Sequence, residues 1–270
     1  MAITTLDGAL AGMQWPRYIA KGLTGTMVTG RPQSLWATAG SPSAGTYDAT
    51  LNGVALSSSS AQVTGQIPFS NPASGNTYLA RFQGSSTIAG TLLLCDRLWH
   101  NGGFTSTVTT AQTLTSPTWP ARDANGATNG DGVLVGLELS TVVGAAAPTL
   151  TLGYTNQAGT ASRTATNVIA TSSSATAGGF YPFGLMSGDI GVRSVQSLTL
   201  SVSWVSGTIN LVAYRVLAAL ELTGAQTPNA VDAITSGFPR IYDGAVPFLL
   251  FIPSTTTTSN ISGQVIWTQG

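Results

Sequence analysis

The side chains that could act as a nucleophile or a base are few in this sequence. It contains one cysteine, Cys95, and one histidine, His100. On one regular strand, an odd separation places the two on opposite faces, roughly 16 Å apart at the usual rise per residue. A Cys–His catalytic pair needs hydrogen-bond contact. We therefore exclude this pair. Asp96 shares a face with His100 but lies roughly 13 Å from it by the same rise.

The residues after the histidine favour a structural role for it. The run His100-Asn101-Gly102-Gly103 is rich in turn-forming residues and indicates the end of a strand followed by a turn. Cys95 lies in the apolar run TLLLCDRLW, which predicts a buried, unreactive thiol. With a single cysteine, an internal disulfide and a multi-cysteine zinc site are both excluded.

Carboxylate catalysis is also poorly supported. A glycosidase needs two carboxyl groups about 5 to 9.5 Å apart. The only glutamates, Glu138 and Glu221, each lie in an apolar strand-like segment and could instead pair with strand arginines such as Arg97 or Arg215. Most aspartates adjoin Gly or Asn, where a turn explains them. The sequence has no phosphate-binding loop, nucleophile elbow or dinucleotide fingerprint. We expect neither an enzyme nor a cofactor.

One segment, residues 122–132, has the residue types of a metal site. Asp123 and Asn125 correspond to the first two ligands of an EF-hand calcium loop. That loop needs Gly at its sixth position and Glu at its twelfth, where this chain has Thr128 and Leu134. An EF-hand is excluded. Two interpretations stay open: consecutive Asn-Gly and Asp-Gly turns, which we favour, and a looser calcium site formed by Asp123, Asn125, Asn129 and Asp131.

The composition restricts the class of partner. The chain is 43% hydrophobic but only 7% charged, with a net charge of zero, whereas soluble domains are about 25% charged. Disorder is excluded because it combines low hydrophobicity with high net charge. Nucleic-acid binding needs clustered basic residues, and here Lys21 is the only lysine. Ser, Thr, Gly, Asn and Gln replace the missing charges, which predicts a hydroxyl-coated surface suited to permanent protein contacts.

The chain shows no membrane segment or secretory signal. A membrane helix needs roughly 18 consecutive apolar residues, and the longest candidates, Leu211–Leu222 and Val246–Ile252, are interrupted or short. We interpret both as buried strands. Residues 1–15 include Asp7 and no long apolar run, so we expect no signal peptide and synthesis in the cytoplasm.

Short segments rich in Thr, Val and aromatic residues, separated by Gly, Pro, Asn and Ser, predict strands. We expect a Gly84-containing turn, a hairpin at residues 155–159 and a hairpin at Ser206-Gly207. In the segment LTLSVSW, alternation directs Leu198, Leu200, Val202 and Trp204 inward and Thr199, Ser201 and Ser203 outward. The expected strands span residues 77–82, 87–99, 133–140, 149–154, 162–170, 198–205, 208–222, 246–252 and 261–268.

Helical signals occur at two places only. Thr5 opens a short helix that extends to Met13, and a second short helix is expected near residues 229–236, capped by Asn229 or Thr227 and ended by Gly237. The predicted fold class is therefore all-β, an antiparallel, jelly-roll-like β-sandwich. We divide it into residues 1–75, an N-terminal arm with extended loops packed on the main domain, and residues 76–270, the β-sandwich domain.

Four tryptophans near Pro, Gly or the chain ends are candidate interface anchors: Trp15, Trp36, Trp119 and Trp267.

The chain resembles virion structural proteins of tailed bacteriophages, specifically uncharacterised head-associated or decoration proteins. The resemblance spans the full chain and rests on the segments AITTLDGALAGMQWP, GQIPFSNPASGNTYLARF, GTLLLCDRLWHNGG and VPFLLFIPSTTTTSNISGQVIWTQG. It implies a role in the shell or its decoration and transfers no functional residues.

The resulting hypothesis is a non-enzymatic virion protein that decorates or cements the capsid. Its expected partners are the major capsid protein or other virion proteins and further copies of itself, with a trimer favoured; nucleic acid and membranes are not expected partners. The alternative hypothesis is a tail or baseplate module that recognises the host by binding cell-surface glycan through exposed aromatic residues.

Overall fold

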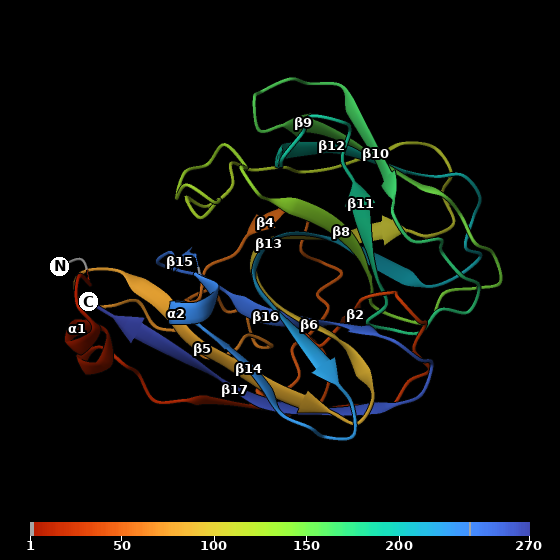
Figure 1. The fold of residues 1–270 in the computed structure, drawn as a ribbon. Helices are drawn as coiled ribbons and strands as arrows, with labels where there is room; N and C mark the ends of the chain where they lie inside the picture. The colour runs from red at the N-terminus through yellow and green to blue at the C-terminus, as the bar shows by residue number, and fades with distance from the viewer. Residues whose placement is uncertain (1–2, 238) are drawn as a thin grey trace.

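Alternating apolar and polar residues form two antiparallel sheets that pack face to face (Figure 1). The computed structural model describes residues 3–237 and 239–270, so the first two residues of the expected N-terminal arm lie outside the described part. The all-β, antiparallel sandwich predicted from the sequence is confirmed. Its sheets contain more strands than the eight of a jelly roll.

The smaller sheet, sheet A, has the strand order β14-β5-β17-β1-β3, and β15 also pairs with β5. Its strands are β1 (Arg17–Leu23), β3 (Gly40–Ser41), β5 (Thr77–Ser86), β14 (Asn229–Asp232), β15 (Arg240–Ile241) and β17 (Ser259–Gln269).

The larger sheet, sheet B, has the order β2-β16-β6-β13-β8-β11-β10-β9-β12-β7, and β4 also pairs with β6. It curls, so that β9, β10 and β12 lie above β8 and β13 in Figure 1 while sheet A lies below. Its strands are β2 (Gln33–Ser34), β4 (Val54–Ala55), β6 (Ala89–Thr105), β7 (Gln112–Thr113), β8 (Leu134–Leu139), β9 (Leu150–Asn156), β10 (Arg163–Asn167), β11 (Phe180–Gly184), β12 (Val192–Leu200), β13 (Thr208–Thr223) and β16 (Pro247–Pro253).

The two longest strands, β6 and β13, connect two hydrophobic cores. Leu92 and Leu94 of β6 pack with β13 and β16 against sheet A, in what we call the sandwich core. Further along β6, Leu98 and Trp99 enter a second core enclosed by the curled half of sheet B, which we call the distal core. Because each long strand belongs to both cores, the two halves of the molecule share one continuous framework.

The hairpin expected at Ser206-Gly207 is wrong. Strand β12 ends at Leu200 and pairs with β9 and β7, whereas β13 pairs with β6 and β8. The expected inward alternation stops at Val202, which is exposed, although Trp204 is fully buried. Val205 and Gly207 both have positive φ angles, 69° and 106°, and turn the chain away from β12 before β13 begins.

The turn expected at Gly84 is also wrong. Gly84 lies inside β5, opposite Gly263 of β17 and Asn229 of β14, and the chain reverses only after Ser86. The hairpin at residues 155–159 is confirmed, because β9 and β10 pair directly from Tyr154 and Arg163 onward.

Both helices form, with one change of cap. Helix α1 (Leu6–Ala11) begins at the expected Thr5, whose side chain accepts a hydrogen bond from the Gly8 amide. Helix α2 (Ala233–Ser236) ends at the left-handed Gly237 as expected, but its cap is Asp232 rather than Asn229 or Thr227, because the preceding residues belong to β14. Neither helix is long and apolar enough to span a bilayer, among the residues that the structure describes.

The segment assigned to an arm contributes a full strand to sheet A. β1 pairs with β17 over its whole length, from Arg17 to Leu23, and is therefore part of sheet A. Residues 24–76 are mostly irregular, contain only the short β2, β3 and β4, and lie against β6 and β16. Residues 24–75 thus form an irregular covering segment, whereas β1, which also precedes residue 75, belongs to the sandwich.

Gly136 of β8 lies so close to the ring of Phe180 that a substitution there tests the packing inside sheet B. A Cβ atom on Gly136 of β8 would overlap the ring of the fully buried Phe180. We expect Gly136→Ala to lower the free energy of unfolding by about 1–3 kcal/mol through overpacking, measured by urea titration. The control is Gly22→Ala on β1, whose added methyl would meet Asn260 Oδ1 at an ordinary 3.5 Å. Equal effects of the two substitutions would contradict the packing described.

Candidate functional site

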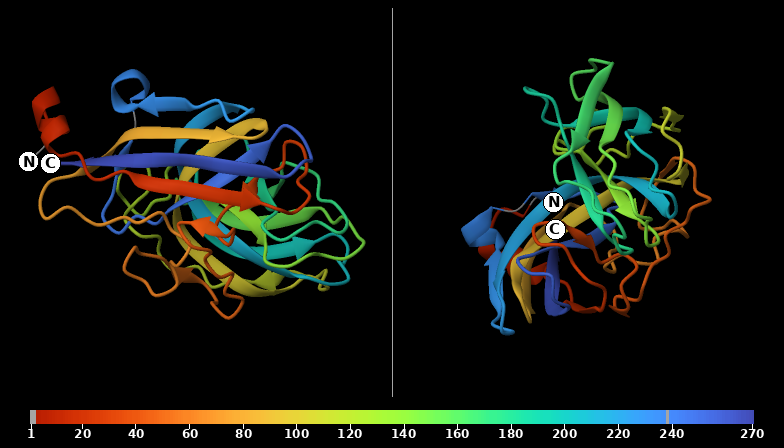
Figure 2. Two further views of the ribbon diagram at one scale, coloured as in Figure 1. Left: turned by 90° about the horizontal axis from the view of Figure 1, so that it is seen from below. Right: turned by 90° about the vertical axis from the view of Figure 1, so that its right-hand side faces the viewer.

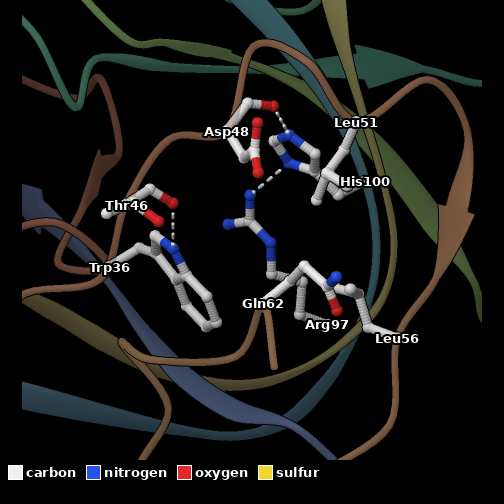
Figure 3. A pocket seen from close by; sticks show the side chains of 8 residues that line it. All are labelled: Trp36, Thr46, Asp48, Leu51, Leu56, Gln62, Arg97 and His100. Atoms are coloured by element: carbon white, nitrogen blue, oxygen red, sulfur yellow. Dashed lines mark hydrogen bonds between the residues drawn. The ribbon is translucent and has the colours of Figure 1, made fainter. Parts of the chain in front are cut away.

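The only histidine, His100, lies beside the buried Arg97 and the backbone of Asp48 (Figure 3). Arg97 of β6 binds Glu138 of β8 across the intervening β13, donating from Nη1 to Oε1 at 3.2 Å and from Nη2 to Oε2 at 2.7 Å. The side chains are 1% and 0% exposed. The interpretation of Glu138 as the partner of a strand arginine is confirmed, and we call these side chains with His100 the Arg97–Glu138–His100 network.

A β-bulge explains why two residues three apart share a face. Trp99 pairs with Ala213 and Arg97 with Tyr214, which leaves Leu98 as one extra residue in β6. An extra residue reverses the side-chain alternation, so His100 Nδ1 lies 2.9 Å from Arg97 Nη2. The expectation that His100 marks a strand end is wrong, because β6 continues to Thr105.

The distances expected from His100 to Cys95 and to Asp96, on which the exclusion of Cys–His and Asp–His pairs rested, assumed a regular strand. Because the bulge at Leu98 lies between these residues and His100, those distances do not apply. The conclusion itself still holds, because the hydrogen bonds of His100 go to Arg97 and to the carbonyl of Asp48. Asp96 instead binds Arg122. Cys95 is buried, as predicted, and burial raises the pKa of its thiol, which keeps the thiol protonated and unreactive.

Aromatic rings surround the Arg97 guanidinium. Its carbon lies 4.5 Å from the ring centre of Trp36 and 5.5 Å from that of Phe248. Cation–π contacts of this kind compensate in part for the lost hydration of a buried cation. Trp36 in turn donates from Nε1 to the carbonyl of Thr46 at 3.0 Å. Arg97 therefore holds both an acid on the sheet and an aromatic residue of the irregular segment.

The hydrogen bonds determine the tautomer of His100. A guanidinium can only donate, so Nδ1 accepts from Arg97 and the proton resides on Nε2, which donates to the carbonyl of Asp48 at 2.8 Å. Burial, reinforced by the adjacent Arg97 charge, lowers the pKa of His100 from 6.5 to about 4. The ring is thus neutral near pH 7 and connects β6 to the irregular segment.

A second buried ion pair strengthens the same attachment. Arg122 Nε donates to Asp96 Oδ2 at 2.9 Å, and Arg122 Nη1 donates to the carbonyl of Leu56 at 2.9 Å. The Asp96 carboxylate also accepts from the Val246 amide at 2.8 Å. Arg122 thus connects the sheet to residue 56, just as the first network connects it to residues 36–48.

The remaining space at the network is small. A cavity of about 10 Å³ is lined by Trp36, Thr46, Asp48, Leu51, Leu56, Gln62, Arg97 and His100. This volume is about that of one water-sized sphere. A site of this size, with its charges already paired, can hold the irregular segment in place but has no room for an organic substrate.

The calcium candidates are placed as follows. Asp123 is fully buried, and its carboxylate accepts from three backbone amides, those of Asn125 at 2.9 Å, Ala127 at 2.8 Å and Gly130 at 3.1 Å. Asn125 and Asn129 are exposed, and the backbone of Asp131 forms a bridge with that of Gly191. The Asp123 carboxylate therefore organises the loop through backbone hydrogen bonds. In the described part of the chain, no group of three or more His, Cys, Asp or Glu side chains could hold a metal ion.

Three of the four candidate interface tryptophans are core residues. Trp36, Trp119 and Trp267 are 1–2% exposed, and each packs edge-on against another aromatic ring of this chain. Their large apolar areas are therefore used within the fold, which corrects the expectation for these three. Trp15 is 85% exposed, so its role at an interface stays a prediction.

The other glutamate does not pair with an arginine. Glu221 accepts from the Thr91 hydroxyl at 2.9 Å on the outside of β13, and the buried Arg215 donates instead to the Arg240 carbonyl at 3.1 Å.

The network around His100 was not found from the sequence because the bulge at Leu98 has no sequence signature. The one signal that could have suggested the network is the spacing of Arg97 and His100, two polar residues an odd number of positions apart within an apolar strand.

Comparisons with known proteins do not assign a family. No protein-family model matches the chain, and no curated protein sequence matches it. A solved structure, the subviral particle formed by VP2 of infectious bursal disease virus, aligns with 11% sequence identity and a TM-score of 0.16, over 96% of this chain and 82% of that chain. An overlap this low carries no argument about fold or function.

The buried ion pair can be tested by a double-mutant cycle. Arg97→Leu leaves Glu138 charged and unpaired in the interior, so we expect it to lower the free energy of unfolding by roughly 3–5 kcal/mol. Adding Glu138→Leu removes the stranded charge and should recover a large part of that loss. Urea unfolding of the four proteins measures the coupling. Additive losses would contradict a paired interaction.

The histidine gives a pH-dependent test. His100 in the unfolded chain has its ordinary pKa of about 6.5, so the unfolded state binds a proton that the folded state excludes down to pH of about 4. The stability from neutral His100 is therefore complete above pH 6.5 and is lost as the pH falls, by up to roughly 3 kcal/mol. In His100→Asn this component should be absent. Urea midpoints measured from pH 7 to 4 that remain parallel for the two proteins would exclude it.

Proposed function

We propose that this chain is a non-enzymatic virion protein of a tailed bacteriophage that decorates or cements the capsid as a homo-oligomer, with a trimer favoured. The distribution of charge is the observation that carries this proposal. Of the ten basic and ten acidic residues, eight are buried, namely Lys21, Arg31, Asp96, Arg97, Arg122, Asp123, Glu138 and Arg215. Only twelve charged side chains remain to cover a surface of 10710 Å².

A surface with so little charge suits closely packed neighbours. Copies arranged on a shell lie side by side, and a low surface charge reduces their mutual repulsion. Repeated weak contacts then add up through avidity. This distribution supports a location in the particle, which is also the location that the proposed resemblance to phage virion proteins implies.

The N-terminal region offers an apolar contact surface. Helix α1 buries none of its residues, and Leu6, Leu10 and Met13 are 60%, 53% and 47% exposed. Trp15, two residues after Met13, is 85% exposed. Exposed large apolar residues close together are typical of protein contact sites, so we assign this N-terminal region to contact with the capsid or a neighbouring copy.

A non-enzymatic role is supported by the use of the titratable side chains. The Arg97–Glu138–His100 network and the Asp96–Arg122 pair connect segments of the fold, and the cavity beside the network is about the size of a water molecule.

The location is tested by cryo-electron microscopy of purified particles and by binding of the purified chain to capsids that lack it. We expect density for this chain on the head. Trp15→Ser should weaken capsid binding by about tenfold or more, since a buried aromatic anchor contributes more than 1.4 kcal/mol. The matched control is Ile234→Ser on α2, a residue that is 81% exposed, which should bind normally. Particles without this chain on the head, or with it on the tail, would contradict the proposal.

A further inference from the structure

The outer face of sheet A presents an uncharged row of polar and aromatic side chains. Register places Tyr18 of β1 directly opposite Gln264 of β17, and Gln264 directly opposite Gln83 of β5. Their chain neighbours Ile19, Val265 and Phe82 are fully buried. Because side chains alternate along a strand, the three residues of the row point away from the core. Figure 2 (left) shows β1 in red, β17 in dark blue and β5 in yellow side by side on this face.

A second row of small residues lies beside the first. Ala20 of β1 is opposite Ser262 of β17, which is opposite Ser85 of β5. The two serine hydroxyls are 3.0 Å apart. These short side chains leave a shallow groove of about 310 Å³ beside the longer Tyr18 and glutamine side chains, bounded at its far side by Pro228.

Polar atoms in the groove remain available to a ligand. Gln264 Nε2 donates to Gln83 Oε1 at a long 3.4 Å. Gln83 Nε2 and Gln264 Oε1 have no partner within the described residues, and neither atom is buried. Tyr18 is 62% exposed. The groove therefore combines one flat apolar surface with amide donors and acceptors and hydroxyl groups, and none of its lining residues is charged.

From this chemistry we infer that the groove over β1, β17 and β5 binds a neutral oligosaccharide. The face of an aromatic ring packs against the C–H face of a sugar ring, and a side-chain amide donates to one sugar hydroxyl while accepting from the next. The row crosses two strand spacings, roughly 10 Å, which is about the length of a disaccharide. An anionic ligand is disfavoured because no cation lines the groove.

This binding activity goes beyond the proposed structural role and does not depend on it. A shallow site with few polar contacts gives a weak affinity for one chain, in the millimolar range. Many copies on one particle would raise the effective affinity for a cell surface through multivalency. The glycan would thus be bound by the sheet face, at a distance from the apolar residues of α1 that we assign to protein contact.

The test uses the full chain with three neutral probes, maltopentaose, cellopentaose and penta-N-acetylchitopentaose, in saturation-transfer NMR and calorimetric titration. We expect at least one probe to bind with a millimolar Kd. Tyr18→Ala should raise that Kd by about tenfold, the loss of one aromatic contact, whereas Tyr18→Phe keeps the ring and should change it by less than about twofold. Gln264→Leu should also raise the Kd, because the amide is lost.

The matched control is Ile234→Ser, which changes an exposed apolar residue of α2 outside the groove and should leave the Kd unchanged. Equal urea midpoints of the variants exclude unfolding as a cause. The inference is overturned if no probe binds at up to about 20 mM, or if Tyr18→Ala binds as tightly as the wild type. It is also overturned if sedimentation shows an oligomer that Tyr18→Ala dissociates, since a second copy would then cover this face.

Discussion

The buried ion pair between Arg97 and Glu138 is the interaction on which the placement of the N-terminal segment depends. Two charges in the interior cost several kcal/mol of lost hydration, and here bidentate hydrogen bonds and the flanking rings of Trp36 and Phe248 offset that cost. The same guanidinium fixes the tautomer of His100, which then donates to the carbonyl of Asp48. A chain with few regular elements between residues 24 and 76 is thereby attached to the most central strands of the molecule.

Eight of the twenty charged side chains are buried, and this lowers the charge of the surface. Because Arg97, Glu138, Asp96 and Arg122 serve to join segments of the fold, fewer charged side chains remain for the surface. Two parts of that surface differ in kind: the apolar residues of α1 and Trp15, and the polar groove at Tyr18. An apolar surface suits a protein neighbour and an uncharged polar groove suits a sugar, so the proposed structural role and the inferred sugar binding would use different parts of the surface.

Local patterns in the sequence were sufficient to predict the two longest strands, β6 and β13, six further strands (β5, β8, β9, β10, β16 and β17) and both helices. The apolar runs that became β13 and β16 and the alternation in β9 depend on neighbouring residues only, and Thr5 acts as a cap within its own turn. The Glu138 interpretation succeeded because a buried acid requires a cationic partner and the chain has few of them. The errors concern long-range features. Ser206-Gly207 looks like a hairpin, but which strands pair is decided by packing in the distal core, and the bulge at Leu98 is set by the partner strand.

Hydrogen exchange tests most directly whether the Arg97–Glu138–His100 network holds the irregular segment on the sheet. Amides of that segment are hydrogen-bonded at Gly45, Leu56 and Ile67 to the carbonyls of Trp36, Leu98 and Pro247. In the Arg97→Leu, Glu138→Leu double variant these amides should lose protection through local opening, while the amides of β9 and β12 keep theirs. Uniform loss across both regions, or unchanged protection at Gly45, Leu56 and Ile67, would contradict the role assigned to the network.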